Sequence, residues 1–491
     1  MKILVNGAWP GVARALRGGV LLGAALLGAC SATASTADAL VIGAVIDRSG
    51  SNAEPSWSDA LALAERQMNE ALKAAGHDLS FHVALSDSRN DPATSVERAT
   101  QLVRDQGAKA LILDTSQNAV AINVLHYDAD PGNDLRVPIQ CSGCTSGSIN
   151  NPTAVNTDPV QQAASRNSQK WMFRTVMSTK LVALIIDRDL LKLGTPAADV
   201  NHDGKVKLAV YNGDETFGNS GANDVISLAR QLQTDPPVLI EQRKHPGNAD
   251  VNTYDWAADL EALTNDRNET TNAVDGVPDF IVYCSFAQYY IPVIKTWRVS
   301  GFDQRVSRMA HFHTFRIQSA GNALGAFGDG QEGVSHVLLD NEESGATFAR
   351  DYMEAFGRSP HYRDSHYYDN AVSLMLATWR AAHALPDPRA VTGAQVRDAL
   401  PGLADTGAQV VRTGVAALTE AIRALDRGAT VNYEGASGPL DYDANQNIKN
   451  RLAHYRLVSG QYVDVARYDC VKASDTATAT ASRAACPFIA P

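Results

Sequence analysis

The sequence LVIGAVI at Leu40–Ile46, followed by SWSDALALAERQMNEALKAA at Ser56–Ala75, has the pattern of a strand and a helix. The first segment is a continuous apolar run, which is typical of a strand buried on both faces. In the second segment, Leu61 and Met68 belong to a set of apolar residues at helical spacing, and Gly76 supplies a stop signal. We therefore predict a strand–helix unit of a buried parallel sheet.

The same alternation continues along the chain in two series, separated by a polar stretch at 145–169. Further strands are expected at 81–85, 110–113, 137–140, 205–211, 238–241 and 280–283, and further helices at 92–106, 118–125, 225–232, 254–263 and 290–299. Strands that alternate with helices imply crossover connections and a sheet covered on both faces. The fold class is therefore predicted to be α/β, with two doubly wound parallel-sheet lobes. Helices at 365–385 and 414–425 and a hairpin at 452–465 complete the expected elements.

The N-terminus has the layout of an exported precursor. Lys2, Arg14 and Arg17 precede an apolar run that ends in Leu27-Gly28-Ala29-Cys30, without an acidic residue before it. This tetrapeptide resembles the bacterial lipobox, in which the precursor is cut before the cysteine and the thiol carries diacylglycerol. We expect residues 1–29 to be a lipoprotein signal peptide, Cys30 the lipidation site and residues 30–39 a tether. The alternative is ordinary cleavage near 32–34, which would leave no lipid anchor.

The remaining chain is acidic. Residues 1–29 contain three basic and no acidic side chains, so the rest has 40 basic and 54 acidic side chains, a formal charge of −14. An acidic protein lacks the basic stripe that nucleic acid or anionic lipid requires. No later apolar run reaches transmembrane length. The expected partners are therefore small solutes, with no nucleic acid, and with membrane attachment through the lipid alone.

Five cysteines follow Cys30, and an oxidising compartment favours pairing among them. Cys470 and Cys486 bracket a tail at 470–491 with little apolar surface, and we expect a disulfide between them to pin it. Cys141 and Cys144 form either a small structural disulfide or two inert thiols. Their spacing would also suit a zinc site, but such a site needs a second pair of ligands, which the sequence lacks. Thiol redox catalysis would require the motif to precede a helix in a thioredoxin-like unit.

Several short motifs occur in the order of a known family. They are Asp87 to Pro92, Trp171-Met-Phe-Arg-Thr175, Val210-Tyr211 before Phe217-Gly218, Gly333-Val334, Tyr368-Asp-Asn-Ala-Val372 and Gly435 to Asp443. Their collinearity resembles the type I periplasmic solute-binding fold, specifically the branched-chain amino-acid (leucine/isoleucine/valine) binding proteins of ABC transporters. The resemblance implies a three-strand hinge near Arg174, Gly333 and Tyr433. Lobe 1 would contain residues 40–173 and 334–432, and lobe 2 residues 174–333 and 433–469.

In such a fold the ligand lies between the carboxyl ends of the two sheets, and closure requires contacts with both lobes. In lobe 1, the helix start after Asp114 and the small-residue loop at 142–145 could bind a ligand carboxylate. Trp57, in the first strand–helix loop, could form an aromatic wall of the ligand site. In lobe 2, the candidates lie on loops that face lobe 1. The candidate ligand-binding residues are Trp57, Asp114, Ser116, Ser142 and Thr145 in lobe 1 and Phe217, Ser285, Phe286 and His313 in lobe 2.

One departure from the family concerns the ligand ammonium. Branched-chain amino-acid binders usually carry an acidic residue at a position that here falls at 311–314, where no carboxylate stands. Either Asp114 supplies the charge from lobe 1, or the ligand is not an amino acid. The identity of the solute stays open.

Three motifs imitate other sites, and none of them leads us to expect a metal or a cofactor. The dinucleotide-like glycine pattern at 328–333 precedes a strand rather than a helix. The calcium-like turn at 199–204 has Val210 where the loop needs a bidentate carboxylate. His311 and His313 lack an evident third ligand.

No nucleophile is paired with a base in the sequence, so no catalytic residue is assigned and the protein is expected not to be an enzyme. We expect a monomeric extracytoplasmic lipoprotein on the periplasmic side of a bacterial envelope. It would capture a small solute, an amino acid or a related compound, for an ABC permease in the inner membrane. The alternatives are a sensor with the same fold coupled to a membrane partner, and an envelope hydrolase or thiol redox enzyme.

Overall fold

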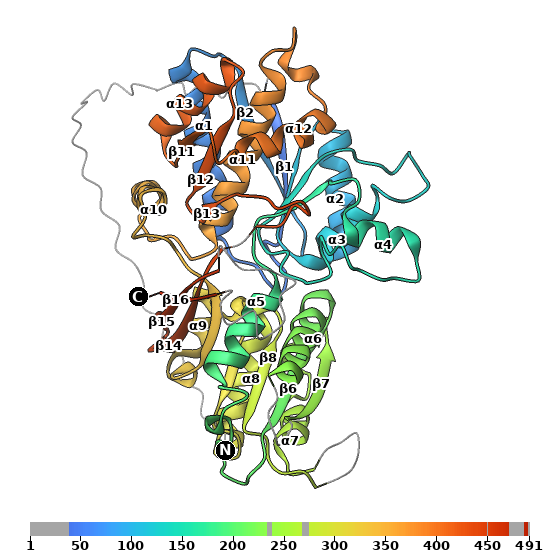
Figure 1. Ribbon diagram of the computed structural model, residues 1–491, viewed down its shortest axis with the longest axis vertical. Helices are drawn as coiled ribbons and strands as arrows, with labels where there is room; N and C mark the ends of the chain where they lie inside the picture. The colour runs from blue at the N-terminus through green and yellow to red at the C-terminus, as the bar shows by residue number, and fades with distance from the viewer. Residues whose placement is uncertain (1–38, 233–237, 268–273, 449, 471–485, 490–491) are drawn as a thin grey trace, which may run out of the picture. The chain divides into compact units, whose positions relative to one another are not determined.

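The computed structural model describes residues 39–232, 238–267, 274–448, 450–470 and 486–489 (Figure 1). The expected signal peptide, Cys30 and the tether up to residue 38 lie outside the described residues, as does most of the tail after Cys470. Within the described part of the chain, no helix is long and apolar enough to cross a membrane.

The strands and helices alternate as far as residue 336. The strands are β1 (Ala39–Ile46), β2 (Ser80–Asp87), β3 (Leu111–Leu113), β4 (Ile139–Cys141), β5 (Met172–Arg174), β6 (Lys207–Asp214), β7 (Leu239–Pro246), β8 (Phe280–Cys284), β9 (Met309–His311), β10 (Glu332–His336), β11 (Gln409–Val411), β12 (Val431–Gly435), β13 (Gly438–Pro439), β14 (Arg451–Val458), β15 (Gln461–Asp469) and β16 (Phe488–Ile489). The helices are α1 (Ser56–Ala75), α2 (Pro92–Arg104), α3 (Ser116–Val124), α4 (Pro159–Arg166), α5 (Thr179–Ile185), α6 (Thr216–Gln231), α7 (Trp256–Thr264), α8 (Ala287–Val299), α9 (Gln318–Leu324), α10 (Glu343–Phe356), α11 (Asp364–Ala382), α12 (Gly393–Ala399) and α13 (Val415–Asp426).

Lobe 1 is built on a parallel sheet of order β2-β1-β3-β4-β5. Successive side chains of β1 enter two different cores. Leu40 and Ile42 pack in the cluster that contains α1, α11 and α13, and Val41 and Val45 pack in the cluster of α2 and α3. The alternation explains why the whole strand is apolar, since neither face of the sheet is exposed to water.

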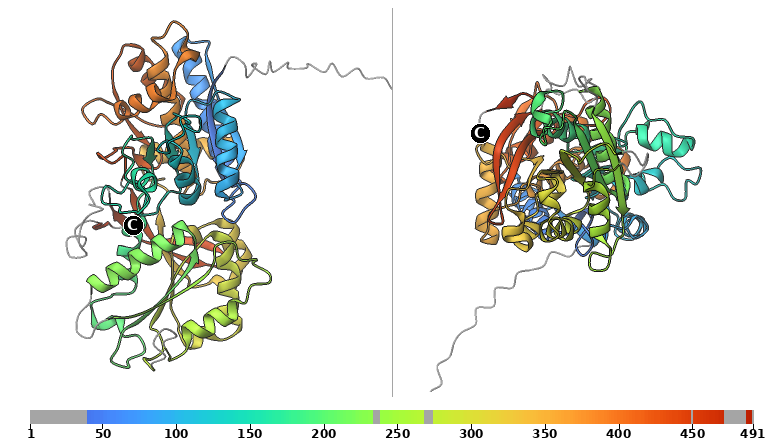
Figure 2. Two further views of the ribbon diagram at one scale, coloured as in Figure 1. Left: turned by 90° about the vertical axis from the view of Figure 1, so that its right-hand side faces the viewer. Right: turned by 90° about the horizontal axis from the view of Figure 1, so that it is seen from below.

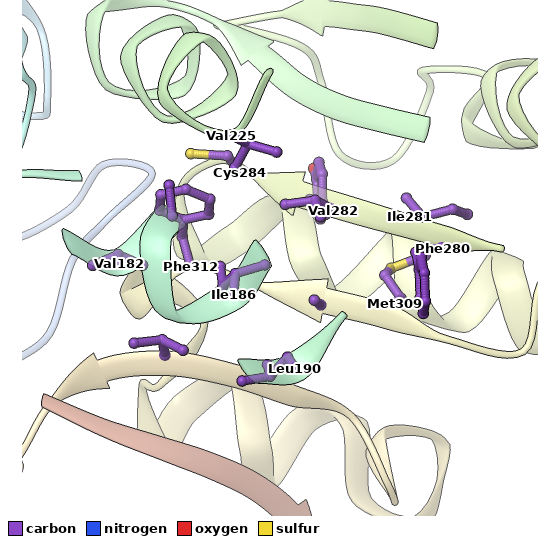
Figure 3. Packing of buried hydrophobic residues seen from close by; sticks show 14 of the residues in the cluster. Val182, Ile186, Leu190, Val225, Phe280, Ile281, Val282, Cys284, Met309 and Phe312 are labelled. Atoms are coloured by element: carbon purple, nitrogen blue, oxygen red, sulfur yellow. The ribbon is translucent and has the colours of Figure 1, made fainter. Parts of the chain in front are cut away.

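Lobe 2 is built on an eight-stranded sheet of order β16-β15-β14-β10-β9-β8-β6-β7. Strands β6, β7, β8, β9 and β10 run parallel to one another. Strands β14, β15 and β16 extend the sheet beyond β10 through antiparallel pairs. Helices lie on both faces of this sheet (Figure 2). Its core includes Val182 of α5 and Ile186 and Leu190 of the turns that follow, which lie near Phe312 in Figure 3.

The chain passes between the lobes three times: from β5 to α5, from β10 to α10 and from β13 to β14. The first and third passages lie side by side, because Arg174 N donates to Gln446 O at 2.9 Å. The segment boundaries expected at 333/334 and 432/433 fall inside β10 and β12.

The predicted fold class is confirmed, but several helices were not expected or begin elsewhere, among them α5, α9, α4 and α6. Helix α4 lies within the polar stretch at 145–169, where Asp158 accepts from Val160 N and Gln161 N and caps it. Helix α6 begins at Thr216 rather than at residue 225, because the carboxylate of Glu215 caps its first turn. Few buried apolar residues mark these starts, because α4 buries only Ala164 and in α6 Phe217 is followed by Gly218, Asn219 and Ser220, so helical periodicity is weak.

Both expected cysteine pairs are disulfides, Cys141–Cys144 and Cys470–Cys486. The thiol of Cys284 is buried and free. Of the two alternatives for Cys141 and Cys144, the structure therefore has the disulfide.

Candidate functional site

The loops at the carboxyl edge of the lobe 1 sheet surround the start of α11. Trp57, in the first turn of α1, is 1% exposed, and its ring stacks on Tyr367 with 4.8 Å between ring centroids. The guanidinium carbon of Arg363, the residue before α11, lies 4.7 Å from the Trp57 ring centroid. This edge therefore holds a buried cation against an aromatic wall.

Arg363 is 2% exposed and makes one hydrogen bond, from Nη2 to the carbonyl oxygen of Asp114 at 3.4 Å. Its Nε and Nη1 atoms are buried without a partner. Gly143 gives the guanidinium its space, because a Cβ atom at that position would lie 2.4 Å from Nη2 and 1.9 Å from the Asp114 carbonyl oxygen. Only glycine therefore allows Arg363 to reach this place.

The carboxyl group of Asp114 braces the loop after β1. It accepts from Asp47 N at 2.5 Å and from Asn118 Nδ2 at 3.4 Å. Burial, helped by the neighbouring Asp47 carboxylate, raises the pKa of Asp114 to about 7. At neutral pH this group is therefore partly protonated, and its two oxygens already have partners in lobe 1.

The loop after β4 carries the next candidates. Ser142 Oγ accepts from Asn370 Nδ2 of α11 at 2.9 Å, and Ser116 Oγ accepts from Ser146 N at 3.1 Å. Thr145 accepts through its carbonyl oxygen from Thr179 N at 2.7 Å, while its Oγ1 is buried without a partner. Ser142 and Ser116 thus support the loop, and Thr145 keeps a free hydroxyl.

Lobe 2 contributes imidazoles from two strand ends. His313 follows β9, and its ring lies 5.1 Å from that of Phe217 and 5.4 Å from that of His336 at the end of β10. His336 in turn lies 4.6 Å from His366 of α11, which belongs to lobe 1. Side chains from both lobes therefore meet at His336.

The remaining lobe 2 candidates lie in a network inside that lobe. Ser285 Oγ hydrogen-bonds His245 Nε2 at 3.0 Å, and its carbonyl oxygen accepts from Thr314 Oγ1 at 2.6 Å. The Phe286 ring packs 5.8 Å from that of Phe217. The structure thus places His313 at the meeting point of the lobes, with Phe217 and Phe286 behind it.

The imidazoles at this point are uncharged. Burial, together with the Arg363 guanidinium, lowers the pKa of His366 to about 3. Burial also places the pKa values of His313 and His336 well below their usual range. Each ring therefore offers one hydrogen-bond donor and one acceptor.

We use the name "Arg363 cluster" for Arg363, His366, Tyr367, His313 and His336. Its members share an unusual property, since each has at least one buried polar atom without a hydrogen-bond partner. These atoms are Arg363 Nε and Nη1, His366 Nε2, Tyr367 Oη, His313 Nδ1, and His336 Nδ1 and Nε2. Buried polar groups are normally paired, so a concentration of orphan atoms at one place indicates a site that a ligand completes.

The cluster is not arranged as a metal centre. Within the described ranges, no group of three or more His, Cys, Asp or Glu side chains could hold a metal ion. The two histidines of the sequence motif also separate, since His311 Nε2 hydrogen-bonds Gln331 at 2.5 Å inside lobe 2.

An open groove of about 640 Å³ lies elsewhere, between the loop at 146–153 and the first half of α6. Its lining includes Arg174, Asn219 and Asn447 but none of the candidate ligand-binding residues. The Arg363 cluster and this groove are therefore separate features.

Four residues of the Arg363 cluster were not among the candidates predicted from the sequence, namely Arg363, His336, His366 and Tyr367. The motif at 368–372 marked the helix, but its Asp369 accepts from Tyr433 Oη and Ser437 Oγ and organises the β12–β13 turn instead. The available signal was a basic residue, Arg363, directly before a helix whose sequence is suited to burial.

Comparison with solved structures shows the fold. The leucine-binding protein LivK of Thermotoga maritima MSB8 shares 13% identity, covering 87% of this chain and 98% of that chain, with a TM-score of 0.60. A solute-binding protein of an ABC transporter from R. palustris, in complex with benzoate, shares 15% sequence identity. The match covers 92% of this chain and 98% of that chain, with a TM-score of 0.59. LivJ of Streptococcus pneumoniae, a substrate-binding protein in complex with isoleucine, shares 14% sequence identity. The match covers 86% of this chain and 97% of that chain, with a TM-score of 0.57.

No curated protein sequence matches the chain at a significant level. A family profile described as periplasmic binding protein matches residues 39–451, which contain both lobes. With its two-lobed α/β architecture and this match, the chain belongs to the periplasmic binding protein family.

Proposed function

We propose that the protein is the extracytoplasmic solute-binding component of an ABC transporter, which encloses a small solute between its lobes and delivers it to a permease. The observation that carries this proposal is the Arg363 cluster, whose orphan polar atoms come from α11 in lobe 1 and from the ends of β9 and β10 in lobe 2. A ligand that bonds to both sets favours the closed arrangement, because it contacts both lobes only when they meet.

The candidate residues divide into contact and support roles in this proposal. Trp57 forms the aromatic wall, Thr145 and His313 offer free polar atoms to the solute, and Phe217 packs behind His313. Asp114 holds the loop after β1. Ser116, Ser142, Ser285 and Phe286 support these positions through the contacts described above.

The fold accommodates more than one solute class. Among the solved structures of similar fold, one holds isoleucine and another holds benzoate. Both ligands are small and carry a carboxylate, which supports a small organic solute for this chain.

We further propose that the protein is lipid-anchored through Cys30 and acts as a monomer on the periplasmic side of the bacterial envelope. The lipobox-like sequence Leu27–Cys30 supports this anchor. Mass spectrometry of the purified mature protein tests it. A diacylglyceryl group on Cys30 is expected, and an N-terminus near residue 33 without lipid would contradict it.

Thermal-shift measurements and small-angle scattering test the binding function. The screen should contain amino acids, short peptides, sugars and small carboxylates. A true ligand at about one hundred times its Kd should stabilise the protein by about 2.7 kcal/mol and reduce its radius of gyration. Absence of stabilisation by every compound, or stabilisation without compaction, would contradict the proposal.

A further inference from the structure

Arg363 is a buried cation that forms no ion pair with any of the described residues. Nε and Nη1 have no partner, and Nη2 donates only to a backbone carbonyl. Two carboxyl groups act electrostatically on the guanidinium without pairing with it: Asp114 accepts from Asp47 N, and Glu54 Oε2 is buried without a hydrogen-bond partner. A buried guanidinium without a paired anion is costly for the folded protein, so its presence requires a compensating partner.

The guanidinium is held in a fixed orientation. The Trp57 ring lies 4.7 Å from its central carbon, and the Tyr367 ring lies 6.0 Å away. Gly143 lies against Nη2, where no side chain would fit. A guanidinium held in this way with free Nε and Nη1 donors is prepared for an anion, because a carboxylate oxygen can accept a charge-assisted hydrogen bond from either nitrogen atom.

Where the family usually carries an acidic residue for the ligand ammonium, lobe 2 has no carboxylate. The residues at 311–314 are His, Phe, His and Thr, and His313 is neutral. Glu215 caps its own helix by accepting from Phe217 N and Gly218 N, and burial raises the pKa of its carboxyl to about 8. On the lobe 2 side, an ammonium would therefore face the neutral imidazoles of His313 and His336.

We infer that the solute is an organic carboxylate without an ammonium group, whose carboxylate pairs with Arg363 and whose other end lies against His313 and His336. This inference rests on the proposed function and names the solute class of that site. It also resolves the two alternatives left by the sequence, since Asp114 uses its carboxyl oxygens inside lobe 1 and does not replace the missing lobe 2 acid.

Isothermal titration with matched probe pairs tests the inference. The pairs are 4-methylpentanoate with leucine and 3-phenylpropanoate with phenylalanine, and benzoate, benzamide and inorganic phosphate complete the set. At least one carboxylate should bind, with a Kd at least about tenfold lower than that of its amino acid. Benzamide and phosphate should bind more weakly than the best carboxylate.

Substitution of Arg363, the proposed carboxylate anchor, gives a second test. Arg363→Gln should raise the Kd of the best carboxylate by at least about one hundredfold, in line with the loss of a buried charged partner. The matched control is Arg350→Gln in α10, an arginine of lobe 1 whose side chain is 69% exposed and bonds only its neighbour Asp351. It should keep the wild-type Kd.

A stability measurement separates anchoring from folding. Arg363→Met removes an unpaired buried charge, so the melting temperature of the ligand-free protein should stay the same or rise. A markedly lower value would show that the guanidinium stabilises the fold itself and would overturn its role as an anchor.

The outcomes distinguish this inference from the proposed function. Tighter binding of an amino acid or phosphate, or an unchanged Kd in Arg363→Gln, would overturn the inference and leave solute binding intact. Failure of these probes and of the wider screen to bind the wild-type protein would overturn both.

Discussion

The phenol oxygen of Tyr362 donates to the carbonyl oxygen of His313 at 2.6 Å, and this bond joins lobe 1 to lobe 2. The Tyr362 ring also stacks on His336 with 6.0 Å between centroids. The residue directly before Arg363 therefore fastens the two lobes at the edge of the Arg363 cluster, so that lobe closure and solute contact involve adjacent residues.

Tyr362→Phe should weaken solute binding while leaving the fold intact. The change keeps the ring but removes one interlobe hydrogen bond, worth about 1 kcal/mol, so the Kd should rise about fivefold. Titration calorimetry measures the effect. Tyr289→Phe is the control, because its hydroxyl donates to Gly247 O at 2.8 Å within lobe 2 alone. Equal effects of the two substitutions would show that the Tyr362 bond does not contribute to closure.

Gly143→Ala should displace Arg363. The added Cβ would overlap the Asp114 carbonyl and Nη2 of Arg363, so we expect a destabilisation of about 1–3 kcal/mol together with a loss of affinity. Thermal unfolding and calorimetry measure both effects. At Gly407 an added Cβ meets its nearest atom at 3.4 Å, so Gly407→Ala should change neither quantity. Wild-type affinity in Gly143→Ala would show that Gly143 is not needed to position Arg363 for binding.

The Cys470–Cys486 disulfide should mainly affect stability. It closes a loop with a sequence separation of 16 and holds β16 beside β15. In the chain-entropy treatment, a loop of this length contributes about 3 kcal/mol. The Cys470→Ser/Cys486→Ser variant should therefore unfold at a lower temperature and bind solute normally. An unchanged melting temperature would contradict this assignment.

The Cys141–Cys144 disulfide should instead affect binding, because it fixes the loop that carries Ser142 and Gly143. Its loop is much shorter, so its entropic contribution to stability is smaller. The double serine variant should lose affinity with a smaller change in melting temperature than the Cys470/Cys486 variant. The reverse order of effects would be inconsistent with a loop that positions the site.

Asp114→Asn should reduce the pH dependence of stability of the ligand-free protein. Because burial raises the pKa of Asp114 from 3.8 to about 7, the folded state binds a proton more readily than the unfolded state between these pH values. This contribution to stability is present at low pH and is lost as the pH rises through about 7, with a slope of at most about 1.4 kcal/mol per pH unit.

Chemical denaturation at several pH values, compared between the wild-type protein and Asp114→Asn, measures this difference. The wild type should lose more stability than the variant between about pH 4 and pH 7. Parallel pH profiles of the two proteins would show that Asp114 titrates near its usual pKa in the fold.

The architecture was predictable because its signals are local. The apolar run of β1 and the periodicity of α1 predicted both elements, and the helix begins and ends where expected, with Gly76 at a φ of 98° after its last turn. Helices α4 and α6 were missed or shortened because their starts depend on the capping side chains of Asp158 and Glu215 rather than on apolar periodicity.

Of the proposed site, the sequence pointed only to the strand ends of lobe 1 and to His313. Trp57, Asp114 and Thr145 follow directly from strand–loop order in a doubly wound sheet. Arg363 could not be placed in this way, because the residue that it contacts, Asp114, is 249 positions away in sequence. The partnership exists only because α11 returns to pack on α1 in lobe 1.

The most direct test of solute binding between the lobes is a crystal structure of the protein with the tightest carboxylate from the titrations. The account predicts a carboxylate oxygen about 3 Å from Nε or Nη1 of Arg363, with His313 or His336 of lobe 2 in contact with the same molecule. A solute bound to one lobe alone, or in the groove beside Arg174 with Arg363 left unpaired, would contradict it.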